Sequence, residues 1–185
     1  MATIKTSKEE IVKKAYQVFR TKGYHHTSIA DLSAFCGIRN AHFYYYFKNK
    51  EDLMLEVLNL VKQYFKTKLL LLIENDTLSS KEKLQQIKFF FEKNYHYDNG
   101  GCIMANTVLE TALSESSFLA TIKDFFEFLF ATLKLLFLSQ YQDSKAQELA
   151  EATIQDIEGG IMLMKLYKDN KYLMNALKRA EKLLD

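Results

Sequence analysis

The chain has 185 residues, is 48% hydrophobic and carries a formal net charge of +2, so it has ample apolar material for a core. It contains no proline and only six glycines, and few positions therefore interrupt a helix. Val and Thr, which strands prefer, are less frequent than Leu, Lys, Glu and Ala. This composition predicts an all-α protein and argues against a sheet-based fold.

The chain shows no sign of export or membrane insertion. Its two cysteines lie far apart, which is typical of a reducing compartment rather than of a disulfide framework. Residues 1–10 are polar and charged, unlike a signal peptide. The most apolar stretch, 125–138, is interrupted by Glu127 and Lys134 and is shorter than the ~20 residues of a spanning helix. We therefore expect a cytoplasmic protein without a membrane segment.

Positive charge is concentrated at one end of the sequence. Residues 1–50 hold nine Lys and Arg against three acidic residues, whereas residues 51–185 hold sixteen basic and twenty acidic residues. A basic head on an acidic body is expected when one end of a protein meets a polyanion such as nucleic acid. A solvated charged face would show the same asymmetry, so charge alone leaves both interpretations open.

Caps and glycines divide the chain into about nine helices. The first begins at Ser7, where Ser7 and Glu10 have the spacing of a capping box, and it ends at Gly23. A short second helix follows Thr27-Ser28 and ends at Gly37. Similar capping spacings mark later starts at Ser79 and Ser144. The remaining helices are expected over residues 39–45, 50–73, 80–96, 103–113, 117–140, 145–168 and 171–184.

The stretch from 24 to 50 has the dimensions of a helix-turn-helix, with two short helices separated by Cys36-Gly37-Ile38 behind a longer supporting helix. The outer face of the third helix would display Arg39, Asn40, His42, Tyr44 and Tyr45. Arg and Asn can bond base edges bidentately, and tyrosine hydroxyls reach phosphates. Lys48 and Lys50 stand near the next helix start, where free amides and the helix dipole also attract phosphate.

The span from Ile11 to Leu53 resembles the N-terminal domain of TetR/AcrR-type transcriptional regulators, in order and spacing and without a gap. The matching positions are Ala15, Phe19, Gly23-Tyr24, Thr27-Ser28-Ile29, Asp31-Leu32, Gly37-Ile38, Phe43-Tyr44-Tyr45, Phe47, Lys50-Glu51 and Leu53. The resemblance implies a DNA-binding domain over residues 1–50 and a helical effector-binding and dimerisation domain over residues 51–185.

The resemblance also implies which residues meet DNA. Thr27, Tyr44, Tyr45 and Lys50 fall where family members hold phosphates, and the segment from Arg39 to His42 falls where they face bases. The family usually carries small hydroxyl residues at Arg39 and His42, glycine at Ala41 and histidine at Tyr46, so an operator of unusual sequence is expected. The predicted DNA-contacting set is Thr27, Ser28, Arg39, Asn40, Ala41, His42, Tyr44, Tyr45, Lys48 and Lys50.

For the helical body, the resemblance implies an effector cavity and a dimer interface. The predicted cavity lining is Tyr64, Phe65, Phe90, Tyr95, Met104, Asn106, Phe126, Phe130 and Met162, which would suit a hydrophobic molecule. Aromatic and Met residues at helical spacing also occur as ordinary core. The predicted dimer interface is Glu158, Gly159, Gly160, Met162 and Leu163, since paired glycines let two helices approach closely. A helix irregularity beside the core is the alternative.

The sequence thus predicts a homodimeric repressor that binds a pseudo-palindromic operator on double-stranded DNA and is released by a small, hydrophobic effector. No cofactor, metal site or catalytic residue is predicted. One alternative is an enzyme in which Cys102 and His96 act as nucleophile and base across the Gly100-Gly101 break. Another is a helical interaction module without a DNA role. A shift of random DNA at low salt would favour the regulator over both.

Overall fold

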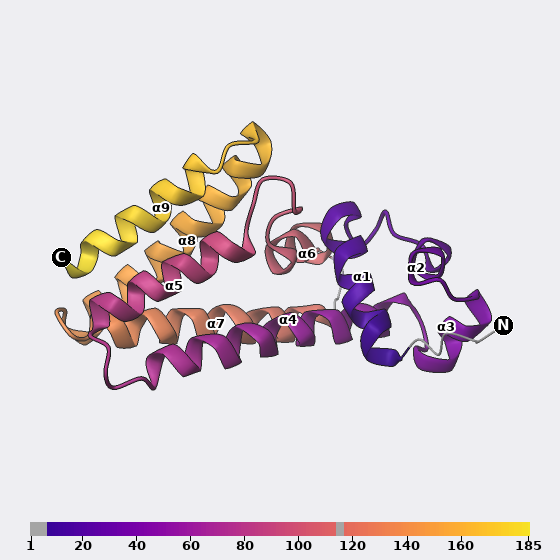
Figure 1. Cartoon of the computed structure of the whole chain (residues 1–185), viewed down its shortest axis with the longest axis horizontal. Helices are drawn as coiled ribbons and strands as arrows, with labels where there is room; N and C mark the ends of the chain where they lie inside the picture. The colour runs from indigo at the N-terminus through magenta and orange to yellow at the C-terminus, as the bar shows by residue number, and fades with distance from the viewer. Residues whose placement is uncertain (1–6, 114–116) are drawn as a thin grey trace. The chain divides into compact units, whose positions relative to one another are not determined.

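The computed structural model describes residues 7–113 and 117–185, and its described residues contain helices but no strand (Figure 1). The all-α prediction is confirmed. The helices are α1 (Lys8–Lys22), α2 (Ile29–Cys36), α3 (Asn40–Tyr46), α4 (Lys50–Ile73), α5 (Ser80–Asn94), α6 (Ile103–Thr111), α7 (Phe118–Phe137), α8 (Asp143–Tyr167) and α9 (Lys171–Glu181), followed by the 3-10 helix η1 (Lys182–Leu184).

Local signals place most helix starts. Both serine caps predicted for α1 and α5 are present, because Ser7 and Ser79 accept from the backbone N–H three residues on. The cap predicted at Ser144 is wrong. Helix α8 begins at Asp143, with Gln142 as its N-cap, so Ser144 lies inside the first turn. An acidic residue in a first turn is favoured by the helix dipole, which is consistent with the earlier start at Asp143.

The contact pattern divides the chain into two compact units, and the first includes the described residues of 7–62 and 103–122. Within it, α1 contacts both α2 and α6, and α2 contacts α3. Fully buried side chains from successive helices form its core, including Phe19, Leu32 and Phe43. Gly37 ends α2 in the left-handed conformation, with φ +71°. This contact-defined unit includes α6, which packs with α1, and the DNA-binding domain over residues 1–50 stays a prediction.

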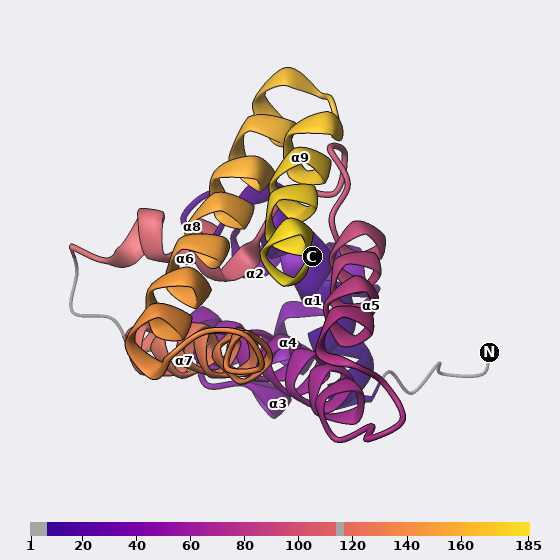
Figure 2. The ribbon, with the colours of Figure 1, turned by 90° about the vertical axis from the view of Figure 1, so that its left-hand side faces the viewer.

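The second unit consists of residues 63–102 and 123–185. Helices α8 and α9 run antiparallel along each other, and α5 lies beside α9 (Figures 1 and 2). Gly160 permits the close approach of α8 to α9, because a Cβ there would lie 3.0 Å from the Tyr172 backbone oxygen and 3.2 Å from Leu173 Cα. An aromatic cluster around the buried Phe65 forms part of the core.

Within the residues that the structure describes, none of the helices combines the length and the apolar character required to cross a bilayer.

Candidate nucleic-acid interface

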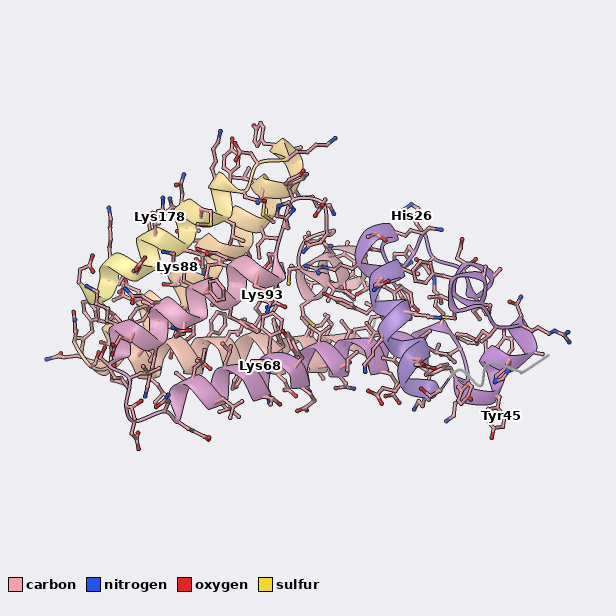
Figure 3. The ribbon with its side chains drawn as sticks, viewed as in Figure 1. His26, Tyr45, Lys68, Lys88, Lys93 and Lys178 are labelled. Atoms are coloured by element: carbon pink, nitrogen blue, oxygen red, sulfur yellow. The ribbon has the colours of Figure 1, made fainter. Side chains whose placement is uncertain are left out.

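The inner face of helix α3 is buried and its outer face is exposed. Phe43 is fully buried and packs against Phe47, with ring centroids 5.5 Å apart. On the other side, Tyr44 and Tyr45 are 57% and 80% exposed, and Figure 3 shows Tyr45 projecting away from the ribbon. The preceding segment, Arg39 to His42, is exposed throughout. The predicted exposure of this face is therefore confirmed.

The exposed rings of α3 are held in place by one another. His42 stacks on Tyr46 at 5.4 Å between centroids and 17° between planes. Tyr45 meets Tyr46 edge-on at 4.9 Å and 87°. Aromatic pairs in these geometries are mutually stabilising. The outer face thus presents a largely pre-organised set of ring nitrogens and hydroxyls, which reduces the entropy lost on contact with a partner.

The start of α2 is tightly hydrogen-bonded. Ser28 Oγ donates to Asp31 Oδ2 at 2.5 Å and accepts from the Asp31 backbone N–H at 3.1 Å. Lys22 Nζ donates to the other Asp31 oxygen at 2.9 Å. The Ser28 hydroxyl and the Lys22 ammonium together hold the pKa of Asp31 far below its ordinary value. Ser28 is nevertheless exposed, whereas Thr27 is buried and donates to the Gly23 carbonyl oxygen at 2.6 Å.

The two lysines near the start of α4 differ in their surroundings. Lys48 is exposed, and its ammonium makes no ion pair with any residue described in the structure. Lys50 Nζ instead donates to the carbonyl oxygens of Tyr24 and Thr27, both at 2.8 Å, and lies 4.3 Å from the Tyr24 ring centroid. Partial burial lowers the pKa of Lys50. Of the ten predicted DNA-contacting residues, Thr27 is thus buried and Lys50 half-buried, and the other eight are exposed.

The sequence did not identify two residues that shape this site. The His25 backbone N–H donates to Glu110 Oε2 at 2.9 Å, and His25 Nε2 lies 3.1 Å from the Glu110 carbonyl oxygen. Tyr24, next to His25, meets Phe118 edge-on with centroids 5.0 Å apart. Glu110 and Phe118 come from α6 and the start of α7, and nothing local in the sequence links either to the helix-turn-helix.

The predicted cavity lining does not coincide with an apolar cavity of the second unit. That cavity is lined by Leu69, Leu84, Ile87, Lys88, Phe91, Leu129, Thr132, Leu133, Thr153, Ile154, Ile157, Leu177 and Ala180, and contains none of the nine predicted residues. Tyr64 and Met162 are 42% and 58% exposed. Phe65, Tyr95 and Met104 are buried, and Phe90, Asn106, Phe126 and Phe130 are half-buried. Helical spacing identified apolar positions but not which of them face this cavity.

This cavity is nearly filled by its own side chains. Its volume of about 10 Å³ leaves room for roughly one water molecule. The polar groups around it are few: Thr132 Oγ1 donates to the Phe128 carbonyl oxygen, and Lys88 pairs with Glu181 at 2.8 Å. The Thr153 side chain is buried and also lines the cavity. The lining is thus mostly apolar.

The five predicted dimer-interface residues have different environments. Gly160 is buried against α9 of the same chain, and a role for it in contact between chains stays a prediction. At Gly159, a Cβ would meet nothing within 4 Å. Met162 is 58% exposed and Leu163 half-buried. Glu158 is half-buried, and burial raises the pKa of its carboxyl to about 7, opposed by a hydrogen bond with Cys102.

The two residues of the alternative enzyme hypothesis, Cys102 and His96, have different surroundings. The Cys102 side chain is 2% exposed and lies beside Glu158. His96 Nδ1 lies 2.8 Å from Asp98 Oδ1, which engages one of its two ring nitrogens. Among the described residues, no three His, Cys, Asp or Glu side chains are grouped so that they could hold a metal ion.

Two family models match most of the chain. Residues 11–57 match the model of bacterial regulatory proteins of the tetR family, and residues 82–179 match that of the C-terminal domain of LmrA/YxaF-like transcriptional regulators. Similar curated proteins include two uncharacterized HTH-type transcriptional regulators. One, in the lacX 3' region of Lactococcus lactis subsp. lactis, is 26% identical and covers 90% of this chain and 87% of its own length. The other, YxaF of Bacillus subtilis, is 27% identical and covers 91% and 90%.

Solved structures show the same architecture. A TetR transcriptional regulator from Legionella pneumophila superposes with a TM-score of 0.90 at 25% identity, covering all of both chains. Regulatory protein TetR from Rhodobacter sphaeroides superposes with a TM-score of 0.83 at 21% identity, covering 95% and 97%. Together with the two matching domains and the exposed outer face of α3, these similarities show that the chain belongs to the TetR family of helix-turn-helix transcriptional regulators.

Proposed function

We propose that the protein is a homodimeric repressor that places α3 of each subunit in successive major grooves of a pseudo-palindromic operator. The observation that carries this proposal is the outer face of α3. Arg39, Asn40, His42, Tyr44 and Tyr45 are all exposed there, while Phe43 holds the opposite face in the core. Arg and Asn supply bidentate base contacts, and the tyrosine hydroxyls and Lys48 supply phosphate contacts.

The test of DNA recognition is selection of bound sites from a random duplex pool by the full chain. We expect an enriched inverted repeat whose half-sites lie about 34–36 Å apart or a multiple of that distance, because two-fold symmetric proteins read two-fold symmetric sites. The variant Arg39→Ala should relax selection at one position of each half-site. Lys145→Ala, at an exposed lysine of α8 paired with Glu148, should leave the selected site unchanged. A pool without an enriched sequence would contradict the proposal.

We further propose that the effector is a compact, mostly apolar molecule that enters the cavity of the second unit. The lining supports this class of ligand because it is mostly apolar and the Lys88 charge is already paired with Glu181. Since the cavity holds little more than a water molecule, binding must displace side chains and so favour another conformation. Release of DNA would then reflect the difference in effector affinity between the two conformations.

The effector proposal is tested by screening neutral apolar compounds for release of labelled operator. Ala180→Leu narrows the cavity, since Ala180 lines it, and should abolish release by any active compound while operator affinity stays within about twofold. Ala120→Leu adds the same volume at an exposed position of α7 and is the matched control. Equal release from the Ala180→Leu variant and the control would place the effector elsewhere.

The dimer is proposed to form through α8 and α9. Met162, Leu166 and Tyr167 expose 58%, 67% and 61% of their surface along α8, and apolar side chains exposed together mark candidate interaction surfaces. Met162→Asp should shift the protein toward monomer in sedimentation equilibrium, whereas Leu71→Asp, at an apolar residue of α4 with 62% exposure, should not. A Met162→Asp variant that sediments as the wild type would exclude this surface.

A further inference from the structure

The loop between α1 and α2 is held by residues far away in the sequence. The His25 backbone N–H donates to Glu110 Oε2 at 2.9 Å, and His25 Nε2 donates to the Glu110 carbonyl oxygen at 3.1 Å. Glu110 thus contacts the loop both through its side chain and through its backbone. A hydrogen bond to a charged acceptor is stronger than one between neutral groups, so the carboxylate contact is the stronger restraint.

The loop is shaped around this carboxylate. Gly23 has φ +84°, a conformation that favours glycine, and a Cβ at this position would lie 2.6 Å from Glu110 Oε1. Any side chain at residue 23 would therefore have to displace the Glu110 carboxylate from its position. Glycine here serves two purposes: it permits the backbone turn, and it leaves the space that Glu110 occupies.

The Lys50 ammonium group, from α4, binds the same loop. Lys50 Nζ donates to the Tyr24 and Thr27 carbonyl oxygens, each at 2.8 Å, and lies over the Tyr24 ring. The Glu110 charge acts on Lys50 as well, in the direction that favours its protonated form. The five residues from Gly23 to Thr27 are thus fixed by one anion and one cation, which come from α6 and α4. The loop in turn leads directly into the Ser28 cap of α2.

We propose that Glu110 is a positioning residue for DNA binding, which holds the Gly23–Thr27 loop, and through it the start of α2, in the geometry that lets α3 reach the major groove. This inference rests on the proposed DNA-binding function. It implies that the first fifty residues are not a self-contained DNA-binding module, since α6 supplies part of the restraint on their loop.

The test compares operator affinity across salt concentrations for Glu110→Ala, Glu110→Gln and the control Glu9→Ala, whose carboxylate pairs with Lys13 on its own helix. Glu110→Ala should weaken binding about five- to twentyfold, because a charged hydrogen bond within the loop is lost. The slope of log affinity against log salt should stay unchanged, because no phosphate contact is removed. Glu110→Gln keeps an oxygen acceptor for the His25 N–H and should recover affinity to within about threefold. A reduced salt slope in Glu110→Ala, or equal losses in the Ala and Gln variants, would overturn the proposal.

A double-mutant cycle with Gly23→Ala adds a second test. Gly23→Ala and Glu110→Ala disturb the same contact, so their combined loss of affinity should be smaller than the product of the single losses. Independent, multiplicative losses would contradict the proposed arrangement.

An NMR measurement separates failure of the inference from failure of the DNA-binding proposal. The His25 amide resonance of the free protein should shift in Glu110→Ala and remain near its wild-type position in Glu110→Gln and Glu9→Ala. This readout needs no DNA, so it tests the Glu110 contact even if the wild type binds no operator. An unshifted His25 amide in Glu110→Ala would overturn the inference.

Discussion

Each unit of the molecule contains three consecutive identical aromatic residues on a helix, tyrosines on α3 and phenylalanines on α5, and the two runs differ in chemistry and in environment. Tyr44 and Tyr45 of α3 are 57% and 80% exposed, with Tyr46 half-buried. In the second unit, Phe89 of α5 is 63% exposed, Phe90 is half-buried and Phe91 is 2% exposed. Three consecutive helical residues point in three directions, so neither run can lie wholly in a core.

The difference between the runs shows what composition can and cannot predict. Tyrosines carry hydroxyls, so an exposed tyrosine run keeps polar groups available to water or phosphate. A phenylalanine side chain carries no polar group. Phe89 is exposed because the helix turns it away from the core when Phe91 is buried. Adjacent residues of the same type therefore differ in their contribution to the protein. Substitutions at matched positions measure this difference in stability or in DNA affinity.

The largest contrast is expected between Phe91 and Phe89. Phe91 packs against Phe65 and Tyr95, with centroids 6.0 and 5.8 Å away, so Phe91→Ala should lower the free energy of unfolding by about 3–5 kcal/mol. Phe89→Ala removes an exposed ring and should change the free energy of unfolding by no more than about 0.5 kcal/mol. Urea unfolding measures both values. Similar losses from the two substitutions would mean that the exposed Phe89 is covered, for example by a second subunit.

The acidic residues Glu158 and Glu127 are expected to differ by nearly as much in their effect on the free energy of unfolding. The pKa of Glu158 is raised to about 7 from an ordinary 4.5, so between these pH values the folded chain retains a proton that the unfolded chain has lost. Stability therefore falls as pH rises through this window, by at most about 3 kcal/mol. Glu158→Gln cannot ionise, so it should be more stable than the wild type at pH 8 by up to about this amount and similar to it at pH 4.

The control for this pH dependence is Glu127→Gln, at an exposed residue of α7 that pairs with Lys123. Its urea midpoint should follow that of the wild type from pH 4 to pH 8. If Glu158→Gln also follows the wild type at every pH, the Glu158 carboxylate is solvated in the folded protein.

The pair Gly159-Gly160 should give effects of opposite sign. A methyl group at Gly160 would press against the α9 backbone at 3.0–3.2 Å, so Gly160→Ala should destabilise the chain by about 1–3 kcal/mol. At Gly159 the added methyl meets nothing, and the gain in helix propensity should stabilise the chain by up to about 1 kcal/mol. Thermal unfolding at fixed protein concentration compares the two. A destabilising Gly159→Ala would indicate that Gly159 is packed against another subunit.

The features that sequence predicted well depend on near neighbours. Ser7 with Glu10 and the glycine at position 37 mark helix ends because a cap is formed by residues three or four positions apart. The exposure of the outer face of α3 also follows from local sequence, because the buried Phe43 fixes which side of the helix faces the core. The contact of Glu110 with His25 joins residues 85 positions apart, and no local pattern encodes it. Spacing along α5 likewise does not show which apolar face meets α9.

The smallest difference is expected between the two lysines near the start of α4, in how each affects the salt dependence of DNA binding. Sequence placed both Lys48 and Lys50 near phosphates, and each phosphate contact contributes about 1 to the slope of log affinity against log salt. In the structure the Lys50 ammonium is engaged by two carbonyl oxygens, while Lys48 is exposed. We now expect Lys48→Ala to reduce the slope by about 1, since one phosphate contact is lost, and Lys50→Ala to weaken binding at every salt concentration with a smaller change in slope. Filter binding from 50 to 200 mM salt, a range in which phosphate contacts dominate the change in affinity, distinguishes the two. If the slope falls equally in both variants, Lys50 leaves the loop carbonyls for a phosphate when DNA binds.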